Sequence, residues 1–280
     1  MSRAWLVLGL VLCACDAGTV SGGEDLSLDG GTADLPGSDG PRDVSVMDHD
    51  LVPQPDGTSP DGPAVCQAIP GVSYGKLGVT QPCGCNPAQH GDMNLLLRKW
   101  RSVAATKGLV SVTGPTDDKA PQLYTLFVDE RVPGFPEVYQ VEQWDWGCNC
   151  PSGYITSPQV TLAGMATAPG EVIRTPASGY DIGGGNTAVV LHAAQGTITL
   201  KYTTEDNVVY GYTIHLSGIC VEPKLQALYD QCHAAGRKQL PALKGRQPLG
   251  RATGAQIQAA IRDTGSWMDP RVKKDWWQGK

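Results

Sequence analysis

Two glutamines stand at alternate positions near the C-terminus, in the stretch GAQIQAAIRD that covers residues 254–263. Alternation of Gln256 and Gln258 with Ile257 is typical of a β-strand, on which residues two apart project from the same face. A zinc enzyme would place two histidines in that arrangement, because imidazole binds Zn²⁺ and can also act as a base. A glutamine amide is neutral, binds zinc poorly and cannot act as a base. The pair is therefore interpreted either as part of a hydrogen-bonding face or as solvent-facing strand residues without a role.

Seven cysteines follow residue 65, and two pairs of them form the C-x-C motifs CGC and CNC. They are Cys66, Cys83, Cys85, Cys148, Cys150, Cys220 and Cys232. In an exported chain disulfides are the default, and a four-cysteine zinc site is the alternative, although such sites usually have C-x₂₋₄-C spacing. Cys220 and Cys232 flank a short helical pattern and are a candidate local pair. The connectivity cannot be deduced from the sequence, and an odd count leaves one thiol over.

Export is predicted by the first fifteen residues, in which Arg3 precedes an apolar run that is too short to span a bilayer. The run ends in LCAC, which resembles the lipobox of bacterial lipoproteins. That resemblance implies a signal peptide over residues 1–15 and a lipid on Cys15; an ordinary cleaved signal is the alternative. No other segment approaches about 20 apolar residues, so a lipid is the expected membrane anchor.

Residues 16–65 differ sharply from the rest of the chain in composition. They contain 10 Asp, 9 Gly and 6 Pro and no aromatic residue, and their eleven acidic residues face a single base, Arg42. Such a segment cannot bury enough apolar surface to offset its ordering entropy, so we expect a disordered acidic tether. The whole chain carries −6, the tether −10 and Arg3 +1, which leaves +3 for residues 66–280. This mild charge, without a basic run, does not indicate nucleic-acid binding.

The elements that must position these side chains are mostly strands. Residues 92–108 have the apolar spacing of a helix, and residues 109–114 and 123–130 resemble strands. The aromatic stretch 138–150 follows, in which Trp144 and Trp146 would share one face, either for packing or for stacking on a sugar. Further strands are expected near residues 171–174, 186–192, 197–202, 208–215, 247–251 and 256–262, with a tight turn at GGGN and a helix over 223–236. The pattern predicts a mainly β fold, an antiparallel barrel or sandwich, preceded by a small disulfide-linked α+β region.

Five pieces of the C-terminal half, taken in order, resemble the lysostaphin/LytM-type peptidoglycan endopeptidases. They are GEVIRTPASGYD, GNTAVVLHA, YGYTIHL, KGRQPLGRATG and AAIRDTGSWMDPR, which span about residues 168–271. The resemblance implies a LytM-type (duplicated hybrid motif) β-domain over residues 153–280, after a Cys-rich region of unknown type over 66–152. It also implies a zinc ion that is held by the His and Asp of H-x-x-x-D and by the second His of H-x-H.

Carried over residue by residue, the resemblance leaves little of that zinc site. The His of the Y-x-H-L motif matches His215, while H-x-H falls on Gln256 and Gln258. The segment where H-x-x-x-D should lie, about residues 155–168, contains neither His nor Asp. We therefore interpret QIQ as relict metal-site positions and His215 as a remnant of the catalytic machinery, with a purely structural histidine as the alternative. No zinc or other cofactor is expected there.

The sequence thus favours a lipid-anchored pseudoenzyme of the cell envelope, facing the periplasm or the cell surface. Its LytM-like domain would bind peptidoglycan or regulate a cell-wall hydrolase. Two alternatives stay open. One is an active metallopeptidase with a non-standard ligand set drawn from Asp181, His192, His215, Asp263 or the Cys cluster. The other is a surface carbohydrate-binding or adhesion module that uses its Trp residues.

Overall fold

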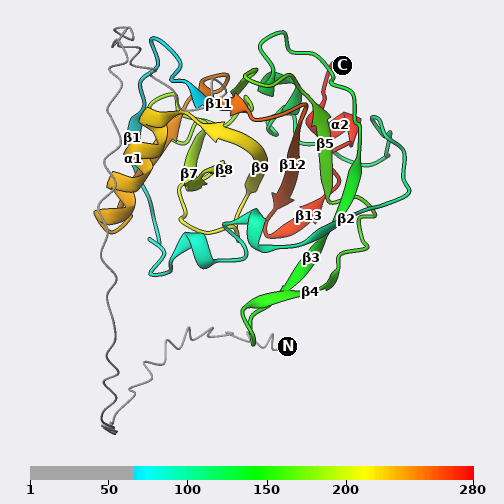
Figure 1. Ribbon diagram of the computed structural model, residues 1–280, viewed down its shortest axis with the longest axis horizontal. Helices are drawn as coiled ribbons and strands as arrows, with labels where there is room; N and C mark the ends of the chain where they lie inside the picture. The colour runs from blue at the N-terminus through cyan, green and yellow to red at the C-terminus, as the bar shows by residue number, and fades with distance from the viewer. Residues whose placement is uncertain (1–65) are drawn as a thin grey trace, which may run out of the picture. The chain divides into compact units, whose positions relative to one another are not determined.

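The computed structural model describes residues 66–280, and within this range the chain is built on one antiparallel sheet (Figure 1). The strands follow the order β1-β10-β7-β8-β9-β12-β5-β3-β2 across the sheet, while β11 joins β6 to β9, β13 pairs with β12 and β4 pairs with β3. The sheet is open, with β1 and β2 at the two ends of this order, and is not a closed barrel. The predicted signal peptide, Cys15 and the acidic tether lie outside the described residues.

The strands in chain order are β1 (Gly75–Gly78), β2 (Trp100–Ser102), β3 (Val138–Asp145), β4 (Cys150–Tyr154), β5 (Leu162–Ala166), β6 (Val172–Arg174), β7 (Ala188–Ala194), β8 (Gly196–Lys201), β9 (Tyr212–Val221), β10 (Gln239–Leu243), β11 (Pro248–Ala252), β12 (Gln256–Asp263) and β13 (Ser266–Met268). The helices are α1 (Pro223–Ala234) and α2 (Lys273–Trp276), and the 3-10 turns are η2 (Pro87–Gln89), η3 (Leu95–Leu97) and η4 (Leu123–Leu126). None of the described helices is long and apolar enough to cross a bilayer.

Residues 66–152 and residues 153–280 share this sheet. From the first segment, β1 pairs with β10 and β3 pairs with β5, and both pairs are antiparallel. Phe127 from the first segment and Trp277 from the last turn are both fully buried in the same core cluster. Residues 66–152, for which the sequence indicates no fold type, therefore contribute edge strands and core residues to the β-fold.

The central strands have two unlike faces. One face is apolar: Leu200, Ile214 and Ile261 lie side by side on β8, β9 and β12, and all three are fully buried in the main core. Because side chains alternate along a strand, the residues in between project from the other face. That second face is polar, and it is described below as the candidate site.

Helix α1 illustrates how local sequence fixes an element. Glu222 caps the helix, since its carboxylate accepts hydrogen bonds from the backbone N–H groups of Lys224 and Leu225, and Pro223 occupies the first turn. Gly236 follows the helix with φ near +81°, a conformation that glycine adopts without strain. The helix lies beside β7 and β10 (Figure 1) and buries Cys232 among their apolar side chains.

Most of the strands expected from two-residue alternation are present. The predictions near 171–174, 186–192, 197–202, 247–251 and 256–262 correspond to β6, β7, β8, β11 and β12, and the predicted helix over 223–236 is α1. GGGN is a turn whose three glycines all have positive φ. Near 208–215 the strand begins only at Tyr212 and continues to Val221.

The helix predicted over residues 92–108 is wrong. The chain there forms only the turn η3, and residues 100–102 pair with β3 as strand β2. The side chain of Asn94 accepts the N–H of Leu96 and so caps the short turn η3 at its start. A helix that began at residue 92 would have to break this local bond. The strand predicted over 123–130 is also wrong, because residues 123–126 form η4, and 109–114 contributes only a single bridge at Val110.

Three disulfides are present among the described residues. Cys83 pairs with Cys85, Cys148 pairs with Cys150, and Cys66 pairs with Cys220 across 154 positions of the sequence. The candidate pair of Cys220 with Cys232 is therefore wrong, because Cys220 on β9 pairs with Cys66, while Cys232 is a buried residue of α1 with a free thiol. Each C-x-C motif closes on itself, so only Cys66–Cys220 joins distant parts of the chain.

We expect the Cys66–Cys220 disulfide to dominate the covalent contribution to stability. Closure of a loop of 154 residues removes unfolded-state entropy worth on the order of 5 kcal/mol, against about 1–2 kcal/mol for a C-x-C loop. The variant Cys66→Ser/Cys220→Ser should therefore lose several kcal/mol of unfolding free energy in urea titrations. The control, Cys148→Ser/Cys150→Ser, should lose far less; equal losses in the two variants would contradict this account.

Candidate functional site

The polar face of the sheet consists of rows of side chains that run across β8, β9 and β12. In one row Lys201 lies opposite Thr213, which lies opposite Arg262. The next row holds Thr199, His215 and Ala260, and a third row holds Thr197, Ser217 and Gln258. We call these three rows, together with Gln256 and the facing residues of β5, the polar face. Directly paired residues share a face, so this arrangement follows from the register alone.

Gln256 and Gln258 share one face as the sequence predicts, and Ile257 between them is buried in the core. Neither glutamine is a free solvent-facing side chain, because both are half-buried. Gln256 donates its Nε2–H to the hydroxyl of Tyr139 at 3.0 Å, and Gln258 accepts the hydroxyl proton of Ser217 at 2.8 Å. The two amides therefore take part in a hydrogen-bonding network.

His215 lies in the middle of the polar face and is buried. Its Nδ1 is 3.0 Å from Thr199 Oγ1, and that hydroxyl lies 2.6 Å from the carbonyl oxygen of Met93. A carbonyl can only accept, so the Thr199 proton goes to Met93 and the Thr199 oxygen must accept from His215 Nδ1–H. His215 is thereby fixed as the tautomer whose Nε2 carries a lone pair.

Burial and the positive charges of Arg262 and Arg98 hold the pKa of His215 well below its ordinary value. The imidazole is therefore neutral at physiological pH, and the Trp267 ring is stacked on it at a centroid distance of 5.8 Å. Its Nε2 has no hydrogen-bond partner among the described residues. His215 thus presents a buried acceptor to this face.

Strand β5 completes the face on the other side of β12. Gly164 pairs with Gln258 and Ala166 pairs with Gln256, so Leu162, Gly164 and Ala166 lie on the same face as the glutamines. Gly164 is needed there, because a Cβ at this position would lie 2.6 Å from the amide carbon of Gln256. Residues 155–168, where the resemblance would place the absent H-x-x-x-D motif, therefore do border the QIQ strand through β5. The side chains that β5 contributes to this face are apolar.

The donor set of this face does not suit a zinc ion. Zn²⁺ prefers thiolate, imidazole and carboxylate ligands, whereas the side chains beside His215 are amides, hydroxyls and alkyl groups. Across residues 66–280 no three His, Cys, Asp or Glu side chains gather closely enough to hold a metal ion.

The non-standard ligand set weighed from the sequence does not converge. His192 lies on the polar face, one strand beyond Thr199, but Asp181 accepts hydrogen bonds from the N–H groups of Gly183 and Gly185 in the GGGN turn. Asp263 follows Arg262 and projects from the opposite side of β12, where it borders a shallow pocket of about 300 Å³ with Asp117. The C-x-C cysteines are engaged in disulfides.

Several polar groups on and beside this face are buried without partners. They are Lys201 Nζ, Thr213 Oγ1, Thr203 Oγ1, Glu205 Oε2, His215 Nε2 and both ring nitrogens of His192. Lys201 is the most unusual, because its side chain is fully buried and its Nζ has no direct partner among the described residues, although Glu205 and Asp263 are near enough to favour its charge. Burial lowers the pKa of the Lys201 ammonium to about 8, so it is charged at pH 7 despite the missing partner.

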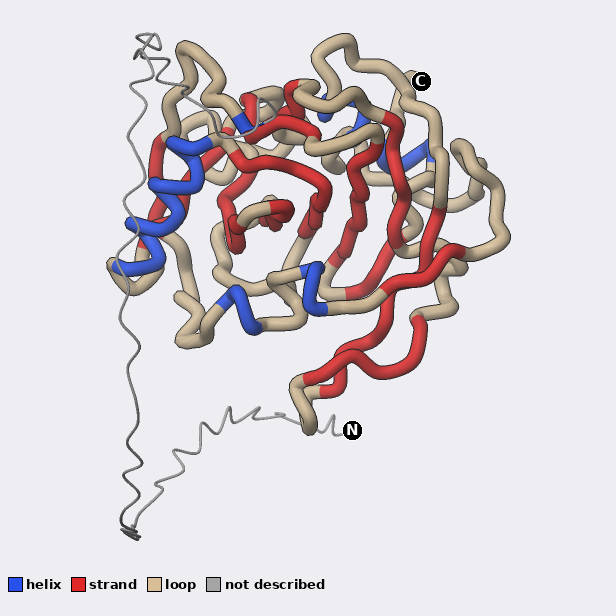
Figure 2. Tube along the Cα trace, viewed as in Figure 1, coloured by secondary structure: helices blue, strands red, loops and turns tan. Residues whose placement is uncertain are grey.

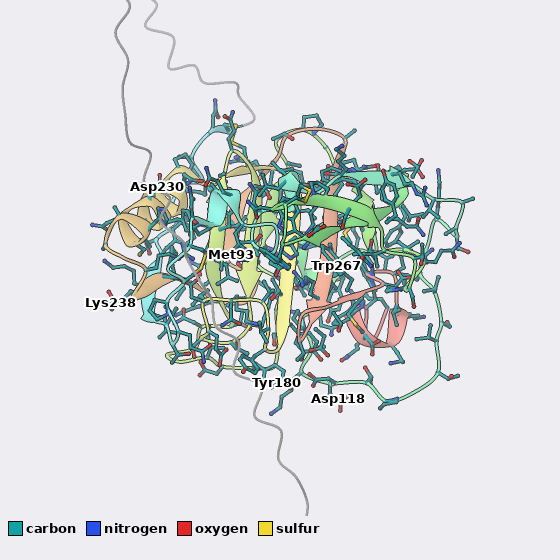
Figure 3. The ribbon with its side chains drawn as sticks, turned by 90° about the horizontal axis from the view of Figure 1, so that it is seen from below. Met93, Asp118, Tyr180, Asp230, Lys238 and Trp267 are labelled. Atoms are coloured by element: carbon teal, nitrogen blue, oxygen red, sulfur yellow. A yellow bond between two sulfur atoms is a disulfide. The ribbon has the colours of Figure 1, made fainter. Side chains whose placement is uncertain are left out.

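Residues 83–98 form a cover over the polar face, which we call the cover segment. Its turns η2 and η3 pass along β7, β8 and β9, and Figure 2 shows these two short helical turns in blue on one loop that crosses the ends of the strands. Its own side chains Met93 and Leu95 are buried. Met93 and Trp267 are labelled near the centre of Figure 3, over the middle strands of the sheet.

Asp92 fastens the cover segment to the sheet. One oxygen of its carboxylate lies 2.6 Å from Arg262 Nη1 on β12 and 2.8 Å from Arg98 Nη2 at the end of the cover. The remaining donors of Arg98 bond to the carbonyls of Gly91 and Glu142, and those of Arg262 bond to the carbonyl of Gly265. Each nitrogen of the two guanidinium groups thus donates one hydrogen bond, and the Asp92 oxygen between them is engaged by both arginines.

The aromatic stretch forms a small cluster beside the cover. Trp144 and Trp146 share a face, as predicted, with ring centroids 6.4 Å apart, and the His90 ring lies 4.9 Å from that of Trp146. Trp144 covers Gly91, where a side chain would clash with the indole. Trp146 remains 55% exposed. Trp144 is therefore a packing residue, while Trp146 offers an open ring.

Sequence reasoning found His215, Gln256 and Gln258 but missed Lys201, Thr199 and Asp92. In TITLKY the alternation does place Lys201 on the same face as Thr197 and Thr199, so the polar character of the face was readable. The burial of Lys201 could not be predicted, because it depends on how the cover segment folds. The apolar residues of that segment have helical spacing, and the sequence therefore predicts a helix there instead of a cover. In comparisons with known proteins, no family model matches the chain, and neither a curated protein nor a solved structure matches it.

Acid should destabilise the protein through the buried histidines. Burial, with the charge of Arg237, lowers the pKa of His192 to about 4, and the pKa of His215 is also low. Between that value and the ordinary 6.5 the unfolded chain binds more protons than the folded one, so stability falls as the pH falls through this window. His192 alone accounts for at most about 3 kcal/mol. Urea titrations from pH 7 to pH 4 should show a slope that becomes clearly smaller between pH 6.5 and pH 5 in His192→Gln/His215→Gln but is unchanged when the exposed His233 is changed to Gln.

Replacing Lys201 by Met should stabilise the protein at pH 7. A depressed ammonium pKa means that the folded state disfavours the charge, and this penalty is fully present below pH 8. Methionine fills a similar volume without a charge, so the gain should be about 1–3 kcal/mol in urea titrations. Lys244→Met, at an exposed lysine, is the matched control and should change little. A loss of stability in Lys201→Met would show that the ammonium is compensated in the folded protein.

Proposed function

We propose that this chain is a lipid-anchored cell-envelope protein whose β-domain is of the LytM type and binds peptidoglycan through the polar face without cleaving it. The observation that carries the proposal is the pairing of β9, β12 and β5. This pairing brings together, on one face, His215, the QIQ motif and the stretch that corresponds to the missing H-x-x-x-D. These are the pieces that the resemblance would gather around a zinc ion.

The side chains on this face favour binding over hydrolysis. Gln256 and Gln258 are held by Tyr139 and Ser217, and their amides and neighbouring hydroxyls are donors and acceptors suited to a peptide backbone. The QIQ end of the face is half-buried, whereas the end at Lys201 is fully buried. A wall peptide would therefore first contact the glutamine end. Regulation of a cell-wall hydrolase through the same face is the related alternative.

A carbohydrate-binding module is the second candidate, and the exposure of Trp146 favours it. An indole that is braced by Trp144 and His90 and open on one side can stack on a sugar ring. The glycan strand of peptidoglycan would be its ligand in the envelope. The two candidates use different residues and different parts of the polymer, so one assay separates them.

The assay is co-sedimentation of the purified full chain, in mild detergent, with intact sacculi and with sacculi whose peptides have been removed enzymatically. The proposal predicts binding to intact sacculi and loss of most of it on the glycan-only polymer, because the glutamine amides recognise peptide groups. Gln256→Ala/Gln258→Ala should weaken binding about tenfold, whereas Gln231→Ala, on the exposed side of α1, should not.

Equal binding to both polymers, abolished by Trp146→Ala, would replace the peptide-binding proposal with the carbohydrate-binding one. No binding to either polymer would contradict both candidates and direct attention to a protein partner. Release of wall fragments during the assay would contradict the non-hydrolytic part of the proposal.

A further inference from the structure

The buried end of the polar face contains an ammonium group that makes no ion pair or hydrogen bond with any described residue, although the carboxylates of Glu205 and Asp263 are near enough to favour its charge. Lys201 is fully buried, its Nζ has no hydrogen-bond partner, and the hydroxyl of the facing Thr213 is equally unpartnered. The next residue in the row, Arg262, is already paired with Asp92. A buried ammonium without a direct hydrogen-bond or ion-pair partner is disfavoured even when a carboxylate lies farther off, so Lys201 is poorly explained as a packing residue.

The unpartnered atoms specify the chemistry of a ligand. Lys201 and Thr213 together offer donors to a negatively charged oxygen pair, as a carboxylate has. His215 offers the opposite, because its tautomer is fixed by Thr199 and its Nε2 can only accept, which suits an amide N–H. Lys201 and His215 are diagonal neighbours on β8 and β9, a relation that separates side chains by about 7–8 Å. A carboxylate with an amide N–H about one residue away is the C-terminal end of a peptide.

The cover segment contacts this face at Thr199 and Arg262, on either side of His215, so a ligand can reach the buried His215 only if the cover moves. The cover is not covalently tied to the sheet beneath it, since the Cys83–Cys85 disulfide is internal to it. Its polar contacts with the face are the ion pair of Asp92 with Arg262 and the hydrogen bond from Thr199 to the Met93 carbonyl. At its two ends the Cys83 N–H donates to the Asp206 carboxylate and Arg98 donates to the Glu142 carbonyl, so opening would turn on these ends. Opening would expose Lys201, Thr213 and His215 together.

We propose that the cover segment is a lid over a peptide-carboxylate site, in which Lys201 and Thr213 bind the terminal carboxylate and His215 Nε2 accepts an N–H of the same peptide. This inference deepens the proposed function and rests on it, because it names the part of a wall peptide that the polar face would take. The glutamines at the half-buried end would contact the preceding residues of that peptide.

The test is calorimetric titration of the full chain, in mild detergent, with N-acetyl-dialanine in the L and the D configuration and with the C-terminal amides of the same compounds. One configuration of the free acid should bind, and its amide should bind at least tenfold more weakly. Acetate should bind far more weakly than the dipeptide; if acetate binds equally well, the site recognises a small carboxylate only and the peptide part of the inference is wrong.

Two kinds of variant test the residues. Lys201→Met should lower the affinity for the acid at least tenfold while the affinity for the amide stays unchanged, and Thr213→Val provides a second test if Lys201→Met folds poorly. Asp92→Asn removes a fastening of the cover outside the proposed carboxylate site and should tighten binding severalfold, because a larger fraction of molecules is open. Lys244→Met is the matched control and should bind like the parent chain.

Co-sedimentation with sacculi on the same preparations separates the two proposals. Binding to sacculi without any preference of the chain for the acid over the amide would overturn the carboxylate site and leave the proposed function standing. Absence of both kinds of binding, including in Asp92→Asn, would overturn both. Acid-selective binding that Lys201→Met abolishes would support the site.

Discussion

One carboxylate, that of Asp92, keeps the polar face closed. It lies between Arg98, which ends the cover segment, and Arg262, which belongs to the central strand β12. Without it, two largely buried guanidinium groups would face each other uncompensated, and the cover would lose its ion pair to the sheet. The contact also connects parts of the chain 170 positions apart, so that the position of a short loop depends on the register of β12 and β9.

The central sheet explains why such a cover is required. Antiparallel sheets commonly pack one face on a core and expose the other to water, and the alternation along β8, β9 and β12 follows that pattern, with Leu200 and Ile214 inside and Lys201 and Thr213 outside. Here the outer face is covered as well. At the QIQ end the buried polar groups are partnered by Tyr139 and Ser217. At the other end Lys201 Nζ and Thr213 Oγ1 are not, and this asymmetry is the reason why we propose a binding site at that end.

The sequence predicts what is local and periodic. Alternation over TITLKY, YTIHLSGI and QIQAAI places the strands and their two faces, and Pro223 with Gly236 delimits α1. What could not be predicted depends on contacts between distant residues: the strand pairing of Trp100 with Val141 overrides a helical spacing, and Cys66 finds Cys220 rather than a neighbour. The candidate site divides in the same way. Polar and apolar residues alternate along its strands, so its polar character can be predicted from the sequence. The burial of Lys201 depends on the cover segment, whose position is known only from the fold.

The hydrogen bonds of the site also bear on whether it cleaves or binds. A histidine that acts as a general base has to become an imidazolium, and in hydrolases a carboxylate commonly supports that charge. The Nδ1–H of His215 is instead held by the hydroxyl of Thr199, with Arg262 and Arg98 nearby, so a proton on Nε2 is disfavoured. Ser217, two residues away on the same strand, gives its own proton to Gln258 rather than to His215. A fixed, neutral acceptor beside an unpaired ammonium is poorly suited to moving protons and well suited to recognising a ligand that carries both an N–H and a carboxylate.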